Sequence, residues 1–327
     1  MTYGGRVSDP AARLAIVRQA VPVDLGGAVL VESWSNDTWL AGKSVLRVCW
    51  RGDRKRLLRE EMLLESLPAS VPHASAVAAG CTEGLTWMVV RRLPGERLDL
   101  VWSRLSARER RDAVVSLASA LKALHLWEPP TVVAEQLHQA PLPAPVIPDD
   151  IVGAGIVPLP VSRLFSLLNW LEEQPGMDSD LADRVRMRVE ELEPLVGDAE
   201  FGDGVVVHGD AHLANALWHE GRLVALLDLE WARLGPSDLE FEAICRDDPD
   251  IQAQVYSRAV AASEVPVLVW LRAGYPELFD RAYLTERVWL YDICFQVRQL
   301  CTTREVPSLH LLQSLANLTL RPRVRFR

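Results

Sequence analysis

The spacing of apolar residues divides the sequence into a strand-rich first part and a helix-rich remainder. Helical spacing occurs twice in the first part, over 7–20 and 54–67. Short extended runs that end in turns of glycine and small polar residues occupy five further segments, 28–32, 38–40, 44–50, 76–80 and 85–90. The pattern predicts meandering strands joined by tight turns, with one helix between the third and fourth.

The remainder of the chain is predicted to be mainly helical. Ser106 is an N-cap residue ahead of a helix that runs to about Trp127. Residues 128–160 contain eight prolines and cannot form one long helix. Helical spacing returns in three places, over 161–173, over 179–195 and in segments between Asp250 and Leu320. The basic end of the chain, 321–327, is predicted to be frayed.

The clearest chemical pattern lies around two short apolar runs at 205–207 and 223–227. The first run enters a loop of small and polar residues that contains Asp210 and Asn215, and the second ends at Asp228. A Glu-Gly pair between the runs predicts a hairpin turn. Pairing of the two runs would bring the three polar residues to one end of a small sheet. One carboxylate could then orient a nucleophile while the other groups hold Mg²⁺ on a nucleoside triphosphate.

These residues also resemble a known family. The loop His208–Asn215 resembles the catalytic loop of the aminoglycoside phosphotransferase and choline kinase-like family, which is related to the protein kinases, and Asp228–Glu230 resembles its metal-binding motif. The resemblance implies an α+β, bilobal, protein-kinase-like fold. Residues 1–91 would form the N-lobe, a small antiparallel β-sheet with one helix, and residues 92–327 a mainly helical C-lobe.

The resemblance also implies a role for each residue of the loop. Asp210 would be the catalytic base, and Asn215 and Asp228 would bind Mg²⁺, with ATP or GTP as phosphate donor. Asp238 matches an aspartate that supports the backbone of the catalytic loop from a helix start. Three residues are expected to support the site without reacting, namely His208, Glu230 and Asp238.

The nucleotide is expected to lie against the strand-rich part. Arg47 occupies the strand position where protein kinases carry a phosphate-binding lysine, and its guanidinium can hold phosphate oxygens in a bidentate fork. Glu60 falls between Leu64 and Leu67 on the helical wheel, so it should face inward and need a cationic partner. Arg47 is the natural candidate for that partner, and Glu61 is the competing carboxylate.

Two further segments are candidates for nucleotide contacts. The turn that contains Ser35 and Asn36 would lie where the nucleotide-binding loop of the related kinases lies, although it lacks their glycine-rich signature. A break in the pattern after the strand at 85–90 is typical of a hinge. Backbone groups near Val90 and Arg92 would be available there to an adenine edge.

Composition limits the class of protein and its partners. The chain has 327 residues, of which 49% are apolar and 24% charged, as in folded soluble proteins. The net charge of −9 argues against general nucleic-acid binding. No apolar run reaches the roughly 18–20 residues of a membrane span, and the N-terminus lacks a signal-peptide pattern. The five cysteines show no metal-site spacing. We therefore expect a cytoplasmic monomer or homodimer with reduced thiols, bound to neither membrane nor nucleic acid.

The acceptor of the phosphate is less constrained than the reaction. An aminoglycoside or related natural product fits an acidic member of the family, and a metabolite alcohol or a Ser/Thr of a peptide natural-product precursor is the alternative. Carboxylates that could meet ammonium groups of such an acceptor follow the metal motif, at Glu240, Glu242, Asp247, Asp248 and Asp250. Tryptophans that could line an aromatic site are Trp102, Trp170, Trp231, Trp270 and Trp289.

Two alternatives belong to other classes of protein. One is a non-catalytic nucleotide-binding pseudokinase, favoured by the absent glycine-rich loop and by arginine at position 47. The other is a metal-dependent hydrolase built on His208, Asp210 and His212, although Gly209 and Asp210 are poor residues for a zinc-binding helix. His125, on the apolar face of its helix, is expected to be structural.

Overall fold

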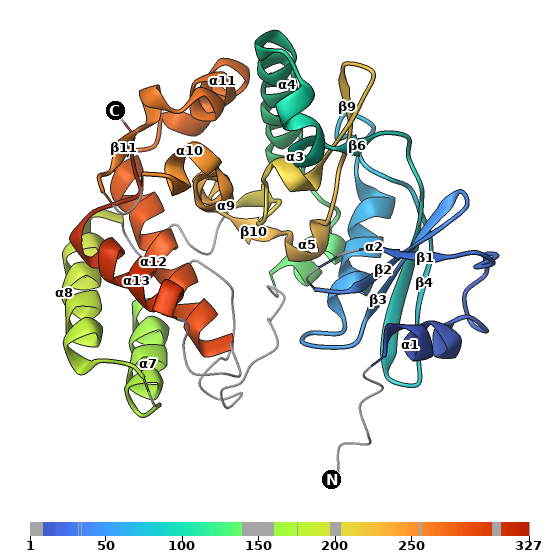
Figure 1. The fold of residues 1–327 in the computed structure, drawn as a ribbon, viewed down its shortest axis with the longest axis horizontal. Helices are drawn as coiled ribbons and strands as arrows, with labels where there is room; N and C mark the ends of the chain where they lie inside the picture. Colours follow the sequence, from blue (N-terminus) through green and yellow to red (C-terminus); the bar gives the residue numbers. More distant parts are fainter. Residues whose placement is uncertain are drawn as a thin grey trace.

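The computed structural model describes residues 9–138, 160–196, 204–302 and 309–326, apart from residues 32, 34, 175, 255 and 256. A twisted sheet with one long helix forms one end of the molecule, and helices form most of the other (Figure 1). Within these residues, no helix combines the length and the apolar character needed to cross a membrane. The segment 139–159, which holds most of the prolines of the proline-rich region, lies outside the described residues.

The sheet has five antiparallel strands in the order β1-β2-β3-β5-β4. Its strands and the two helices that pack on it are α1 (Pro10–Val17), β1 (Val29–Val31), β2 (Asp37–Ala41), β3 (Ser44–Cys49), α2 (Arg56–Ser66), β4 (Ala76–Thr82) and β5 (Leu85–Arg91). The predicted strands and helices of this part are confirmed. Alternating side chains of the central strands, such as Leu46 and Val89, pack with Val17 of α1 in a core of their own.

The described part of residues 92–326 is mainly helical, as predicted. Its helices are α3 (Leu98–Val101), α4 (Ala107–His125), α5 (Thr131–Leu137), α7 (Val161–Glu172), α8 (Ser179–Val196), α9 (Glu240–Asp247), α10 (Pro249–Gln252), α11 (Pro266–Gly274), α12 (Leu284–Thr302) and α13 (Leu309–Leu320). Ser106 caps α4 and forms a capping box with Glu109, because the two side chains satisfy each other's backbone N–H groups.

The strand pairing predicted around the catalytic loop is wrong in one respect. β7 (Val205–Val207) pairs antiparallel with β10 (Arg233–Gly235) and not with the run at 223–227. That run forms β9 (Arg222–Leu226), which pairs across the predicted hairpin turn with β8 (Ala216–His219), and β8 also pairs with β6 (Glu96–Arg97). The alternating burial of four residues in β8 is too short a pattern to distinguish from a loop.

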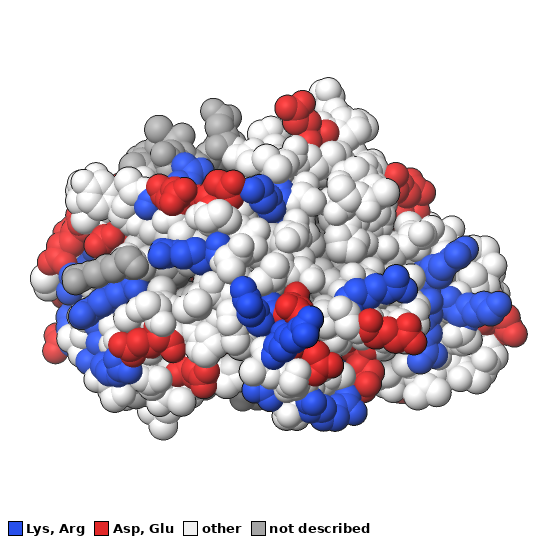
Figure 2. All heavy atoms as spheres, turned by 90° about the horizontal axis from the view of Figure 1, so that it is seen from above, with Lys and Arg blue, Asp and Glu red and all other residues white. Residues whose placement is uncertain are grey.

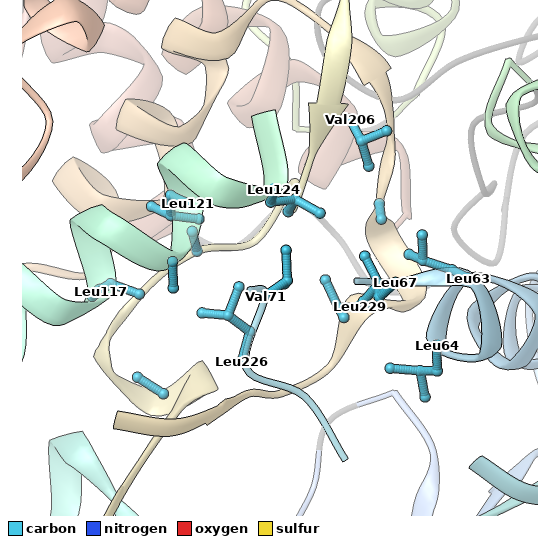
Figure 3. Packing of buried hydrophobic residues seen from close by; sticks show 14 of the residues in the cluster. Leu63, Leu64, Leu67, Val71, Leu117, Leu121, Leu124, Val206, Leu226 and Leu229 are labelled. Carbon is cyan, nitrogen blue, oxygen red and sulfur yellow. The ribbon is translucent and has the colours of Figure 1, made fainter. Parts of the chain in front are cut away.

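A shared hydrophobic core joins the strand-rich and helical parts. Leucines of α2 and of α4 meet there with residues next to the catalytic loop (Figure 3). Leu63 and Leu121 are almost fully buried, as are Val206 of β7 and Leu226 of β9. Full burial of each such side chain contributes about 1.5–3 kcal/mol to stability. The core therefore holds the start of the loop, the end of β9 and helix α2 in a fixed arrangement.

Residues 321–326 are ordered, contrary to the prediction of a frayed tail over 321–327. β12 (Val324–Arg325) pairs in parallel with β11 (Val260–Ala261). The ring of Phe326 lies 4.7 Å from that of Phe241 and 6.2 Å from that of Phe279. The aromatic contacts and the strand pairing hold a segment whose basic composition suggested solvent exposure.

Candidate active site

His208 anchors the catalytic loop through its side chain. It follows β7 and is completely buried. Its Nε2–H donates to the Leu227 carbonyl oxygen at 2.9 Å, and its Nδ1 accepts from the Asp210 N–H at 3.3 Å. Burial lowers the pKa of His208, which favours this neutral form. Because both ring nitrogens are in use and His208 lies at a strand end, the zinc-helix alternative does not fit the structure.

Gly209 is required by the turn that follows. Its φ is +79°, a conformation that side chains disfavour. A Cβ atom would lie 2.2 Å from Nη1 of Arg233 and 2.5 Å from the Trp231 carbonyl oxygen. The close approach lets the loop pack against the segment that follows the metal motif.

A buried carboxylate supports the backbone of the loop, but it is not the one predicted. Oε1 of Glu240 accepts from the His208 N–H at 2.6 Å, and Oε2 accepts from the Gly209 N–H at 3.3 Å. The predicted residue, Asp238, instead accepts from Arg287 at 2.6 Å and from the hydroxyl of Tyr291 at 3.1 Å. Asp238 therefore connects the start of α9 to α12, and the contact with the loop is made two residues later.

Glu240 is itself held by a histidine of α4. Nε2 of His125 lies 3.2 Å from Oε1 of Glu240, and Nδ1 lies 3.2 Å from the hydroxyl of Tyr275. Burial acts to raise the pKa of Glu240, but the hydrogen bonds from the His125 ring and from the His208 N–H outweigh it, so the pKa is lowered. The prediction that His125 is structural is confirmed, and Glu240 is an anion that supports the loop.

Asp210 lies at the centre of a set of polar contacts. Nδ2 of Asn215 donates to its carbonyl oxygen at 2.9 Å and to Oδ2 at 3.1 Å. Nε2 of His212 lies 3.5 Å from the same carboxylate oxygen. Burial acts to raise the pKa of Asp210, but His212 and Arg246 outweigh it and lower the pKa well below its ordinary value. The carboxylate is therefore ionised at neutral pH.

Arg246 is a residue of this site that the sequence analysis missed. Its Nη2 donates to Oδ1 of Asp210 at 2.8 Å and to Asp247 at 3.1 Å, and its Nη1 donates to Glu242 at 2.8 Å. The spacing of Glu242 and Arg246 on α9, four residues apart, could have indicated an ion pair. Arg246 places a positive charge directly against the predicted catalytic base.

The predicted ion pair of the strand-rich part is present. Nη1 of Arg47 donates to Glu60 at 2.5 Å, and its Nη2 donates to Asp228 and, at 2.9 Å, to Glu230. Glu60 also accepts from the Leu229 N–H at 3.0 Å, so it holds both Arg47 and the metal motif. The competing residue, Glu61, is not part of this network in the described residues. We refer to Glu60, Asp228 and Glu230 as the carboxylate cluster.

The carboxylate cluster places three carboxyl groups against the guanidinium groups of Arg47 and Arg56. Burial, together with the neighbouring carboxylates and against the effect of Arg47, raises the pKa of Glu60 to about 8 and that of Asp228 to about 6. Oε2 of Glu230 accepts from Arg47, from Arg56 at 3.0 Å and from Asn36 at 2.7 Å, whereas Oε1 is buried without a hydrogen-bond partner. A cation would relieve both features.

The donor atoms of this region fit a magnesium ion. Mg²⁺ prefers carboxylate and amide oxygens. Asp228 is 30% exposed at its side chain and has a left-handed backbone, with φ of 59°. The amide nitrogen of Asn215 is used by Asp210, and among the described residues its oxygen accepts no hydrogen bond. Asn215 and Asp228 could therefore hold the ion, with Glu230 behind Asp228.

One cleft of about 960 Å³ brings half of the predicted site residues together. This central cleft is lined by Ser35, Asn36, Arg47, Asp210, Asn215 and Asp228, among others. Glu60, Glu230, His208 and Asp238 do not line it; the first three hold the lining residues in place. Figure 2 shows acidic and basic side chains interspersed over one face of the molecule.

The expected hinge contacts are not among the lining residues. Val90 lies within β5, where it pairs with Val45 of β3 and Ala76 of β4. The N–H of Arg92 already donates to the Lys43 carbonyl oxygen at 2.8 Å. An adenine that bound at Arg92 would have to replace that hydrogen bond.

The residues proposed for the acceptor are divided between several environments. Glu240 is committed to the loop, and Asp250 lies outside the lining of the central cleft. Three of the carboxylates line it, namely Glu242, Asp247 and Asp248. Of the five tryptophans, Trp102 and Trp231 line it, whereas Trp170 and Trp289 pack against the core of α7, α8, α12 and α13. Trp270 packs against Trp102, with ring centroids 6.4 Å apart.

Comparison with known proteins identifies the class to which this site belongs. The model of the phosphotransferase enzyme family, abbreviated APH, matches residues 27–278. The match covers most of the sequence, and the chain therefore belongs to this family of phosphotransferases. A search of curated proteins finds no match.

Aminoglycoside phosphotransferases share the fold. The structure of APH(2″)-Ib with ADP has a TM-score of 0.63 at 16% identity and covers 95% of this chain and 99% of its own. A thermostable mutant of APH(4)-Ia in ternary complex with ADP and hygromycin B has a TM-score of 0.60 at 16% identity, covering 95% and 98%. The gentamicin complex of APH(2″)-IIa has a TM-score of 0.61 at 17% identity and covers 95% of this chain and 96% of its own. The bilobal α+β, protein-kinase-like fold predicted from the sequence is confirmed.

Proposed function

We propose that the chain transfers the γ-phosphate of Mg²⁺-bound ATP or GTP to a hydroxyl group of a small molecule. The supporting observation is that Arg47, Asp210, Asn215 and Asp228 line one cleft, with the catalytic loop and the metal motif locked together by His208. We place the boundary between the lobes at residues 91 and 92, so that the nucleotide lies between 1–91 and 92–327.

The ionised carboxylate of Asp210 accepts a hydrogen bond from the acceptor hydroxyl, orients its oxygen and takes its proton as the phosphate bond forms. Asn215 fixes the orientation of that carboxylate, since its amide nitrogen donates to Asp210 at two oxygens. A bound Mg²⁺ would neutralise the charge of the phosphate oxygens. Arg47, fixed by Glu60, steadies the phosphates from the other side. Positioning and charge stabilisation supply most of the rate in such transfers.

The acceptor is proposed to be a hydroxylated natural product or metabolite. The related structures contain hygromycin B and gentamicin, and such compounds belong in the first panel to be tested. Amino sugars, hydroxylated antibiotics, small hydroxy acids and Ser/Thr peptides complete it.

Phosphate transfer from ATP and from GTP with Mg²⁺, measured by the mass gain of each acceptor, tests the proposal. A mass gain of one phosphate that Asp210→Asn removes would support it. Absence of both Mg²⁺-dependent nucleotide binding and transfer would contradict it and favour a non-catalytic role for the fold.

A further inference from the structure

Among the described residues the guanidinium of Arg298 forms no ion pair, although Glu242 and Asp210 lie near enough to act on its charge. It lies near the end of α12 and lines the cleft. Its Nε and Nη1 are buried without a hydrogen-bond partner, and no ion pair joins it to a described residue. Its guanidinium stacks near the ring of Phe295, at 5.1 Å from the centroid. The side chain is therefore held by an apolar contact while its donors stay unused.

The carboxylates nearby are already engaged by another arginine. Arg246 lies over the same ring of Phe295, at 4.2 Å, and binds Asp210, Glu242 and Asp247. Arg233, also buried, donates to the Trp231 carbonyl oxygen at 2.9 Å. We refer to Arg233, Arg246 and Arg298 as the arginine cluster. It places three guanidinium groups beside Asp210, in a protein whose net charge is −9.

A buried guanidinium without a partner costs free energy, because it has lost its hydration and gained no hydrogen bond. Burial, with the charges of Arg233 and Arg246, lowers the pKa of Arg298 to about 10, so it remains charged at neutral pH. A planar guanidinium with free donors is suited to a carboxylate or phosphate. An anion that binds in the cleft would therefore satisfy Arg298.

The position of the arginine cluster indicates whether it binds an anionic group of the nucleotide or of the acceptor. Arg47 and the carboxylate cluster come from β3, α2 and the metal motif, whereas Arg246 and Arg298 come from α9 and α12. Asp210 lies between them, in contact with Arg246. In an in-line transfer the nucleotide and the acceptor lie on opposite sides of the reacting phosphate.

We propose that Arg298, next to Arg246, binds a carboxylate or phosphate group of the acceptor, so that the substrate is an anionic hydroxy compound and not a polycation. The inference rests on the proposed phosphotransferase function and narrows its substrate class. Each acceptor would present its hydroxyl to Asp210 and its anion to Arg298. Arg298 is thus a specificity-determining residue.

A binding experiment tests the anion site without a known substrate. The protein, with and without saturating Mg²⁺ and the ATP analogue AMP-PNP, is titrated with malonate and with inorganic phosphate at constant ionic strength, and its melting temperature is recorded. The variants are Arg298→Gln, Arg298→Lys and, as matched control, Arg108→Gln, because Arg108 is 91% exposed on α4. We expect stabilisation of the wild type and of Arg108→Gln, partial stabilisation of Arg298→Lys and none of Arg298→Gln.

Without added anions, Arg298→Gln should melt about 2–4 °C above the wild type, because it removes an unpaired buried charge. Absence of an anion response in the wild type, or an equal response in Arg298→Gln, would overturn the proposal. A lower melting temperature of Arg298→Gln in anion-free buffer would also count against it. If Arg298→Gln weakens AMP-PNP but not AMP binding, and the malonate response persists, the arginine contacts the donor phosphate and the acceptor assignment is wrong.

Matched acceptors then test the substrate class. The pairs are glycerate with glycerol, homoserine with homoserine amide, and N-acetylmuramic acid with N-acetylglucosamine, with gentamicin as the polycation. We expect the anionic member of a pair to be phosphorylated preferentially, with a KM that Arg298→Gln raises at least tenfold while the KM for ATP stays unchanged. Preferred transfer to gentamicin, unaffected by Arg298→Gln, would overturn the inference and leave the phosphotransferase function intact. Loss of Mg²⁺-nucleotide binding in the wild type would contradict that function independently of the malonate result.

Discussion

On one side of Asp210, the guanidinium groups of Arg47 and Arg56 both form ion pairs with buried carboxylates. On the other side, Arg246 forms ion pairs with the nearby carboxylates, whereas Arg298 forms none with a described residue. The atoms left without partners therefore have opposite character. In the carboxylate cluster the unpartnered atom is an acceptor, Oε1 of Glu230. In the arginine cluster the unpartnered atoms are donors, Nε and Nη1 of Arg298.

The difference shows that burying an unsatisfied polar atom can favour the binding of a cation at one site and of an anion at another. An unsatisfied buried polar atom costs about 1–3 kcal/mol in either cluster. An uncompensated carboxylate is relieved by a cation, and an uncompensated guanidinium by an anion. Functional sites are places where a fold retains such locally unfavourable groups. On the proposed function, the carboxylate cluster would bind the metal-bound nucleotide and the arginine cluster an anionic acceptor.

The largest effect is expected where the two sides meet. Asp210→Asn removes the proposed base, which lies between the two sides, and we expect turnover to fall by about 10²–10⁴, or about 3–5 kcal/mol of barrier. Nucleotide affinity should stay within a few-fold, because Arg47 and the carboxylate cluster are unchanged. Turnover numbers and calorimetric nucleotide binding check this, with Arg108→Gln as control. Turnover close to that of the parent would remove Asp210 from the mechanism.

The next prediction concerns a buried, unpartnered group that lies outside the central cleft, where stability should change but ligand binding should not. Asp292 lies on α12 like Arg298, and both of its carboxylate oxygens are buried without a hydrogen-bond partner, but it does not line the central cleft. Burial and the charge of Glu242 raise the pKa of Asp292 to about 7, against the effect of Arg323 at 3.4 Å. Asp292→Asn should therefore change stability and leave ligand binding unchanged.

The sign of the pH dependence of Asp292 follows from its raised pKa. Between about pH 4 and pH 7 the folded state keeps a proton that the unfolded chain loses, so its contribution to stability is complete below pH 4 and is lost as the pH rises through 7. Asp292→Asn should match the wild type at pH 4 and exceed it by about 4 kcal/mol at pH 8. Urea unfolding at several pH values measures this. A constant difference at all pH values, or a change in nucleotide affinity, would contradict it.

A smaller effect is expected from the carboxylate cluster. Asp228→Ala removes a proposed Mg²⁺ ligand, and we expect the Mg²⁺-dependent part of nucleotide affinity to disappear, a loss of about 10²-fold or about 3 kcal/mol. Asp99→Ala is the matched control, because Asp99 also lines the cleft but forms an exposed ion pair with Arg97. Titration of nucleotide with and without Mg²⁺ distinguishes the two variants. Retained Mg²⁺ dependence in Asp228→Ala would place the metal elsewhere.

The sequence predicted contacts within short segments better than contacts between distant ones. The pairing of Arg47 with Glu60 was predictable, because a strand and the helix that follows it form one unit and the helical wheel places Glu60 inward. The pairing of β7 with β10 was not, because each strand has three residues and the partners are separated by the whole catalytic loop. The unpartnered donors of Arg298 depend on residues of α9, β10 and α12, which no local pattern contains.

Glu240 illustrates the same limit at the scale of one side chain. The motif after Asp228 indicated correctly that a carboxylate near the start of α9 would support the loop. It did not distinguish Asp238 from Glu240, because both are completely buried and the choice depends on Arg287 and His125 from distant helices. The partners His125 and Arg287, distant in sequence, therefore determine which of the two carboxylates contacts the loop.

The smallest effect compares these two carboxylates directly. Glu240→Gln keeps the shape but loses one of two acceptors for the loop N–H groups, and we expect a cost of about 1–3 kcal/mol in the free energy of unfolding together with lower turnover. Asp238→Asn weakens the contacts with Arg287 and Tyr291 and should cost a similar free energy while the turnover of folded molecules stays unchanged. Urea unfolding and turnover, measured on the same preparations, separate the two outcomes. If Asp238→Asn lowers turnover as much as Glu240→Gln at equal stability, the loop depends on Asp238 through its link to α12. The prediction that Asp238 supports the catalytic loop would then be correct.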